Sequence, residues 1–139
     1  IDLKQGTRVY VTCIWNDHEH KQYEHVAVSV KEKVKSILTA NNCAIVEQAN
    51  DADYVVELAA STTMRSDGSG KFGIISYYAN IVGKIVNNRT NKHVLNISLL
   101  QDPHLYSAGS NAGQAVSKAF GSQALAERLQ KLILEGLEN

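Results

Sequence analysis

The sequence lacks any long apolar run, and both proline and cysteine are scarce. No uninterrupted apolar stretch approaches the roughly 18 residues of a membrane-spanning helix. One proline and two cysteines in 139 residues exclude a proline-rich linker and a disulfide-dense scaffold. An excess of charge of one sign is also missing, because 14 Lys and Arg residues balance 14 Asp and Glu residues. We therefore expect no nucleic-acid partner, since no general positive field is present to attract phosphates.

The composition that remains is that of a chain with a packed core. Hydrophobic residues make up 44% and charged residues 20%, which is typical of globular proteins. A chain of this length buries about two-thirds of its unfolded surface, so we expect residues 1–139 to form one domain that folds without a metal or cofactor. The chain opens with Ile1 and its only methionine is Met64. We expect it to be part of a longer exported precursor, although simple truncation explains the same start.

The first third of the chain predicts a strand, a helix and a short strand. Residues 8–15 alternate between apolar and mixed positions, as in a strand with one buried face. Residues 22–40 carry an apolar stripe at helical spacing, formed by Val26, Val30, Val34, Ile37 and Leu38. Asn41 and Asn42 are suited to end this helix, because Asn tolerates the left-handed conformation. Residues 43–46 are then expected to form a short buried strand.

The middle of the chain predicts an antiparallel hairpin followed by one more strand. Residues 54–65 read as a long strand, and the Gly/Ser-rich segment 66–70 as a flexible turn. Alternation resumes from Tyr77 to Val86, and the Asn-rich segment 87–92 is typical of a tight turn. Leu95, Ile97 and Leu99 define the last strand expected in the chain.

The C-terminal part predicts a loop and a long helix. Pro103 ends the preceding strand, and residues 107–113 have the small polar composition of a loop. From residue 112 to 137 apolar side chains keep helical spacing, with Gly121 and Ser122 as a point where the helix bends or splits. We predict an α+β domain of order β-α-β-β-β-α, with two helices on one face of a mainly antiparallel sheet. The other sheet face is then left open.

The densest set of possible metal ligands lies between Asp17 and His25. This segment contains His18, Glu19, His20 and Glu24, and imidazole with carboxylate suits a divalent ion. The spacing differs from HExxH, in which two imidazoles share one helical face. We therefore predict a solvated loop that contacts a partner through His18 and His20, and no metal site. Metal binding and a pH-sensitive contact stay as alternatives.

The two cysteines leave two possibilities open. Cys13 and Cys43 lie on predicted strands that become parallel neighbours if the intervening helix makes a standard crossover. A disulfide between them would stabilise an exported domain by about 3–4 kcal/mol. Two buried free thiols are equally consistent with the pattern, and we favour them because sequence does not show that the side chains meet.

Two possible catalytic or phosphate-binding motifs are both incomplete. Gly68 to Lys71 is not a phosphate-binding loop, because Arg65 stands where the first glycine is needed and Phe72 follows the lysine. A hydrolytic Ser/His pair from Ser107 and His104 has no aligned base. We therefore expect no enzymatic activity.

The neighbouring residues Tyr77 and Tyr78 must point to opposite faces of their strand. Asn80 and Lys84 share the face of Tyr78. If the helices cover the other face, this one is exposed. We select Tyr78, Asn80 and Lys84 as candidate contact residues, with an ordinary mixed sheet face as the alternative.

One segment, Ala52-Asp53-Tyr54-Val55-Val56-Glu57-Leu58, has the character of a family signature. Together with the Asn-Asn helix end, the Gly/Ser turn and the turn Asn88-Arg89-Thr90-Asn91-Lys92, it resembles a group of bacterial envelope lipoprotein domains. The group includes the LPP-twenty lipoprotein family, the amino-terminal domain of TolB and the periplasmic domain of the curli exporter CsgG. The resemblance covers residues 8–137; these families often have Thr-Gly where this chain has Thr90-Asn91. LptE-like assembly lipoproteins are an alternative relative, because they also end in a Leu-rich helix.

The resemblance implies an exported domain on the periplasmic side of the envelope, anchored to the outer membrane by a lipidated cysteine upstream of Ile1. It also implies a function through protein contacts, without catalytic residues. Separately, we expect no cofactor. We expect a non-catalytic lipoprotein domain that binds another envelope protein or associates with itself. The alternative is a periplasmic domain that binds a small ligand or a metal ion.

Overall fold

The computed structural model describes residues 6–138 and has an α+β fold. Ile1 to Leu3, which prompted the expectation of an upstream segment, lie outside the described residues. The strands are β1 (Arg8–Trp15), β2 (Ala44–Ile45), β3 (Tyr54–Asp67), β4 (Ile75–Asn87), β5 (Lys92–Leu99) and β6 (Tyr106–Gly109). The helices are α1 (Val26–Ala40), α2 (Ala112–Phe120) and α3 (Gln123–Glu138), with short 3-10 turns η1 (Lys21–Tyr23) and η2 (Ala49–Asp51).

The strands form one mixed sheet in the order β2-β1-β3-β4-β5, with β6 also paired to β4. Strand β1 is parallel to both β2 and β3, as expected for a crossover through α1. Strands β3 and β4 form the predicted antiparallel hairpin, and β5 and β6 pair antiparallel with successive parts of β4. The predicted mainly antiparallel sheet is therefore correct from β3 onward.

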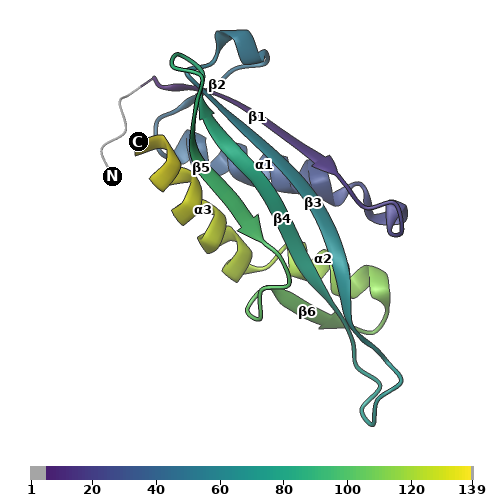
Figure 1. Cartoon of the computed structure of the whole chain (residues 1–139). Helices are drawn as coiled ribbons and strands as arrows, with labels where there is room; N and C mark the ends of the chain where they lie inside the picture. The colour runs from purple at the N-terminus through teal and green to yellow at the C-terminus, as the bar shows by residue number, and fades with distance from the viewer. Residues whose placement is uncertain (1–5, 139) are drawn as a thin grey trace.

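The helices pack on one face of the sheet (Figure 1). The core contains one side of each long strand, for example Val11, Leu58 and Ile81, and the apolar faces of the helices. Trp15 meets Phe120 of α2 edge to face with 5.8 Å between ring centroids, so its side chain packs on the core side of the sheet. No helix within residues 6–138 has the length and apolar character needed to cross a membrane.

Several local predictions are confirmed, and three need correction. Asn42 and Asn91 adopt positive φ at the ends of α1 and of the β4–β5 turn, and the C-terminal helix is split after Phe120. However, β2 is an exposed edge strand rather than a buried one, with Ala44 exposed. The segment 107–113, expected to be a loop, begins with strand β6. Helix α1 starts at Val26, after a 3-10 turn, rather than at residue 22.

The signature segment has an architectural role. Asp53, only 9% exposed, lies just before β3, and its carboxylate accepts the backbone N–H of Arg8 at 2.9 Å. It also pairs with the guanidinium groups of Arg8 at 3.4 Å and Arg89 at 2.6 Å. Asn88 donates to the backbone carbonyls of Ala49 and Ala52, both at 3.0 Å. The signature therefore holds the starts of β1 and β3 and the β4–β5 turn together.

Candidate functional site

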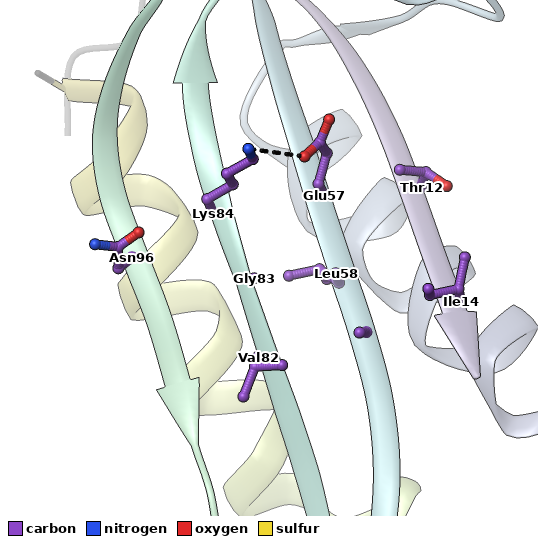
Figure 2. A pocket seen from close by; sticks show the side chains of 9 residues that line it. Thr12, Ile14, Glu57, Leu58, Val82, Gly83, Lys84 and Asn96 are labelled. Carbon is purple, nitrogen blue, oxygen red and sulfur yellow. Dashed lines mark ion pairs between the residues drawn. The ribbon is translucent and has the colours of Figure 1, made fainter. Parts of the chain in front are cut away.

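The site of interest is the sheet face that the helices leave uncovered, which we call the outer face. It is formed by the alternate residues of β1, β3 and β4 that point away from the core, and by neighbouring residues of β5 and β6. Figure 2 shows the middle of this face, with α1 and α3 behind the strands. Because the helices already cover the opposite side, the outer face is the large surface of the sheet that a partner can reach.

A hollow of about 460 Å³ lies at the centre of the outer face (Figure 2). Two rows of paired residues cross it: a polar row and, next to it, an apolar row. The polar row contains Thr12, Glu57, Lys84 and Asn96, and the apolar row contains Ile14, Ala59 and Val82. The small side chain of Ala59 lies between the larger side chains of Ile14 and Val82, so the surface of the sheet is recessed at the middle of this row.

Charge and exposure in the hollow differ between the two rows. Lys84 and Glu57 form an ion pair at 3.5 Å, and their side chains are 40% and 48% exposed. Such an exposed pair contributes little to folding and can be rearranged by a partner. Ile14 is 58% exposed and contributes apolar surface to the hollow. The hollow therefore offers apolar area beside one acid and one base.

A cluster of two tyrosines and one arginine lies on the outer face where β6 pairs with β4. Tyr78 of β4 meets Tyr106 of β6 edge to face, with 5.8 Å between ring centroids. The guanidinium carbon of Arg65 lies 4.0 Å from the centroid of the Tyr106 ring. Tyr78 was selected from the sequence, whereas Tyr106 and Arg65 were missed because only the pairing of β6 with β4 brings them together. Tyr and Arg are the residue types that most often dominate binding energy at protein interfaces.

The selection of Asn80 as an exposed contact residue needs correction. It is 3% exposed, so the expectation that it lies on an exposed surface is wrong. Its amide donates to Thr63 at 2.8 Å and accepts the backbone N–H of Gln101 at 2.9 Å. Gln101 has a positive φ of 46°, which is uncommon for a residue other than glycine. Its hydrogen bond to Asn80 therefore stabilises this conformation in the turn after β5. Asn80 is thus a structural residue within the outer face.

The histidine-rich loop is ordered by internal contacts. His18 is exposed, whereas the side chain of His20 is 18% exposed and its Nδ1 lies 2.9 Å from the Asp17 carboxylate. Burial raises the pKa of Asp17, but hydrogen bonds from the Thr62 backbone and from His20 outweigh it and leave that pKa below its usual value. The Asp17 carboxylate accepts the backbone N–H of Thr62 at 2.9 Å. Thr62 lies on β3 just beyond the end of β1, where that N–H has no partner from β1. Within residues 6–138, no group of three or more His, Cys, Asp or Glu side chains is arranged to hold a metal ion.

The cysteines are both free. Because Ala44 is paired with Arg8, Cys43 lies beside Thr7, six residues along β1 from Cys13. Six residues of strand span about 20 Å, far more than the roughly 7 Å limit between the Cα atoms of a disulfide. Burial raises the pKa of both thiols, that of Cys13 to about 11, so neither is an activated nucleophile.

The Ser107 and His104 pair considered for hydrolysis is not assembled. Ser107 is paired with Tyr77 in the β4–β6 ladder, whereas His104 is exposed in the preceding turn. The backbone N–H of His104 donates to Asp102 at 2.8 Å. Over residues 6–138, no hydrogen bond joins the two side chains, so the structure gives no nucleophile and base in contact.

Comparison with known proteins identifies relatives by fold only. No protein-family model matches the sequence, and no curated protein matches it either. Among solved structures, a PelC dodecamer from Paraburkholderia phytofirmans is 15% identical with a TM-score of 0.53, covering 99% of this chain and 90% of that one. A lipoprotein from Neisseria meningitidis is 9% identical with a TM-score of 0.54, covering 96% and 99%. A minor lipoprotein from Acinetobacter baumannii is 16% identical with a TM-score of 0.52, covering 91% of each.

These similarities cover nearly the whole of each chain. Proteins with this fold thus include bacterial lipoproteins and a protein crystallised as a dodecamer. At these identities the comparison establishes the fold and assigns no specific family. Because one fold serves many functions, the function of this chain depends on the side chains of its surface.

Proposed function

We propose that this chain is a non-catalytic domain of a bacterial cell-envelope lipoprotein, and that it binds a protein partner through the outer face. The partner is another envelope protein or a further copy of the chain. The domain lies on the periplasmic side of the envelope and is held at the outer membrane by a lipid anchor upstream of the described residues. Support for the compartment comes from the lipoproteins among the structural relatives.

The observation that carries the proposal is the cluster of Arg65, Tyr78 and Tyr106 at one end of the outer face. Arg65 already stacks on Tyr106 and Tyr78 already supports it, so a partner would not have to order these side chains on binding. Tyr106 remains 38% exposed and Arg65 is exposed, so both remain reachable. Rigid aromatic and arginine anchors beside a polar strand surface are typical of protein-binding surfaces.

Small-ligand binding is the second candidate, and the hollow is the observation in its favour. Its volume lies within the range of small-molecule pockets. It lies on one face of a sheet, however, and such pockets usually bury most of the ligand between walls. A small ligand would make thermal stability depend on its concentration without needing Arg65 or Tyr106. This difference separates the two candidates.

The test is partner capture in the native host with the full-length precursor. The tagged protein is cross-linked in cells, purified and analysed by mass spectrometry. The double substitution Arg65→Ala and Tyr106→Ala should reduce the captured partner about tenfold or more. A control, Lys118→Ala, changes an exposed residue of α2 on the opposite side and should leave capture unchanged. Equal capture by all three proteins would rule out the outer face as the binding surface.

A further inference from the structure

A hairpin projects from the body of the domain. It is formed by the end of β3, the start of β4 and their turn, residues 64–75, and we call it the arm. Strand β1 ends opposite Ala60, so the arm continues past its neighbour on that side. Figure 1 shows the hairpin extending beyond the rest of the chain. An extension of this kind is available for contacts that the body of the domain does not make.

Three large apolar side chains on the arm are exposed. Phe72 is 80% exposed, Ile74 49% and Met64 48%. Phe72 is the most exposed large hydrophobic residue in the described chain. Phe72 and Ile74, the two most exposed of the three, lie two residues apart in the turn of the arm, and contiguous exposed apolar surface marks an interaction site more often than scattered residues do.

The turn of the arm is held in one shape by its own hydrogen bonds. Asp67 accepts from the backbone N–H of Ser69 at 2.8 Å and from its hydroxyl at 2.5 Å. The backbone N–H of Gly73 donates to the carbonyl of Gly70 at 3.0 Å, and Gly68 and Gly73 have positive φ. The turn therefore presents Phe72 from a preformed structure, which lowers the entropic cost of docking it.

The chain also carries an apolar hollow that is open and of suitable size, on the outer face around Ala59. The arm cannot fill the hollow of its own molecule. Eight residues of strand, about 26 Å, separate Ala59 from Asp67, where the turn begins. Only the arm of another molecule can reach it.

An ionic contact is also available between the two surfaces. Lys71 precedes Phe72, and its Nζ lies 5.8 Å from the centroid of the Phe72 ring. In the hollow, the acid Glu57 borders the apolar row and forms an exposed ion pair with Lys84. A phenyl ring placed against Ile14, Ala59 and Val82 would bring the ammonium group of Lys71 toward the exposed Glu57–Lys84 pair. Lys71 could then replace Lys84 as the partner of Glu57.

We infer that the arm of one copy docks into the outer-face hollow of a second copy, with Phe72 against the apolar row and Lys71 beside Glu57. This inference rests on the self-association half of the proposed function and names its contact. The contact joins two different surfaces, so it is heterologous and builds a closed ring or an open chain of subunits rather than a twofold dimer.

The test uses purified protein and two variants, each with one damaged surface. Phe72→Ser removes the docking side chain and keeps the hollow. Val82→Arg places a bulky cation in the hollow and keeps the arm. Light scattering coupled to size exclusion, over about three decades of concentration, should show oligomers for the unsubstituted protein and association weakened about tenfold or more for either variant alone.

Mixing the two variants gives the decisive result. Each pair of molecules then retains one intact arm and one intact hollow, so the mixture should form one-to-one dimers and nothing larger. Circular dichroism confirms that both variants are folded. A mixture that stays monomeric while the unsubstituted protein forms oligomers would overturn the inference, and so would an unsubstituted protein that stays monomeric at every concentration.

A lipid surface is the rival occupant of the arm, and the same proteins test it. If the unsubstituted protein stays monomeric but floats with phosphatidylglycerol vesicles, and Phe72→Ser does not, the arm binds lipid and the inference is wrong. Monomeric protein together with Arg65- and Tyr106-dependent capture of a host protein would also reject it, while leaving the proposed function in place.

Discussion

Removal of the Asp53 carboxylate should destabilise the domain more than the loss of an ordinary side chain in a turn. The carboxylate satisfies the backbone N–H of Arg8 and two guanidinium groups while being only 9% exposed. Leaving that N–H without an acceptor costs about 1–3 kcal/mol. The two arginines are half exposed or more, so each ion pair adds at most about 1 kcal/mol. We therefore expect Asp53→Ala to lower the free energy of unfolding by about 2–4 kcal/mol.

A second substitution separates charge from hydrogen bonding. Asp53→Asn keeps an oxygen that can accept the Arg8 N–H but loses both ion pairs, so its cost should be about 1–2 kcal/mol. The control is Asp51→Asn, which changes an exposed carboxylate nearby and should shift stability by less than about 0.5 kcal/mol. Urea unfolding at pH 7, followed by circular dichroism, measures all three values.

The pH dependence of the Asp53 effect has a defined sign. The hydrogen bond from the Arg8 backbone is the largest cause that lowers the pKa of Asp53, with further help from the Arg8 and Arg89 side chains against the opposing effect of burial. A lowered folded-state pKa stabilises the fold above the unfolded value of about 3.9, and this contribution is lost as pH falls through the folded-state pKa. The difference between Asp53→Asn and the unsubstituted protein should therefore shrink in acid. Equal losses at pH 7 for the Asp51 and Asp53 variants would refute the reasoning.

Four further predictions concern other parts of the molecule. Gly83→Ala should cost about 3 kcal/mol or more in denaturant unfolding, because a Cβ there would meet the carbonyl oxygen of Glu57; a smaller loss would show that the strands separate easily. Asn80→Ala should cost about 1–3 kcal/mol in the same assay, because the N–H of the β5–β6 turn loses its acceptor, and an unchanged midpoint would contradict this role. Thiol titration of the unfolded, unreduced protein should find both cysteines free; a result of no free thiols would contradict the strand register. In the native state, Cys13 has its pKa raised to about 11, so it should alkylate about 100-fold more slowly at pH 8 than an exposed cysteine. Asp17→Asn should reduce the loss of stability between neutral and acid pH, since the pKa of Asp17 is lowered in the folded state and its stabilising effect disappears as pH falls through that value; an unchanged acid transition would argue against the Thr62 and His20 contacts.

Local patterns predicted the main elements well. The alternation in residues 8–15 and 54–65 and the stripe beginning at Val26 gave β1, β3 and α1, because each buries one face against the same core. Asn42 and Gly121 marked helix ends for reasons that are local to the backbone. These features depend on neighbours within a few residues, so one sequence is enough to find them.

Features that depend on distant neighbours were not predicted. Strand β6 has no strand-like composition and forms because β4 extends past the end of β5 and offers an unpaired edge. That pairing alone places Tyr106 beside Tyr78 and over Arg65. The hydrogen bond that Asn80 accepts likewise comes from Gln101, which lies 21 residues away. The sequence therefore pointed to Tyr78 on β4, whereas its neighbours Tyr106 and Arg65 came only from the tertiary structure.

The most direct test of the outer face as a binding surface is site-specific photo-cross-linking in the native host. A photoreactive amino acid is placed at Tyr106 of the full-length precursor and, in a matched protein, at the exposed position Gln130 of α3 on the helical side. We predict that position 106 cross-links a discrete protein, either an envelope partner or a second copy, and that position 130 does not. Cross-links at position 130 together with none at 106 would contradict the account.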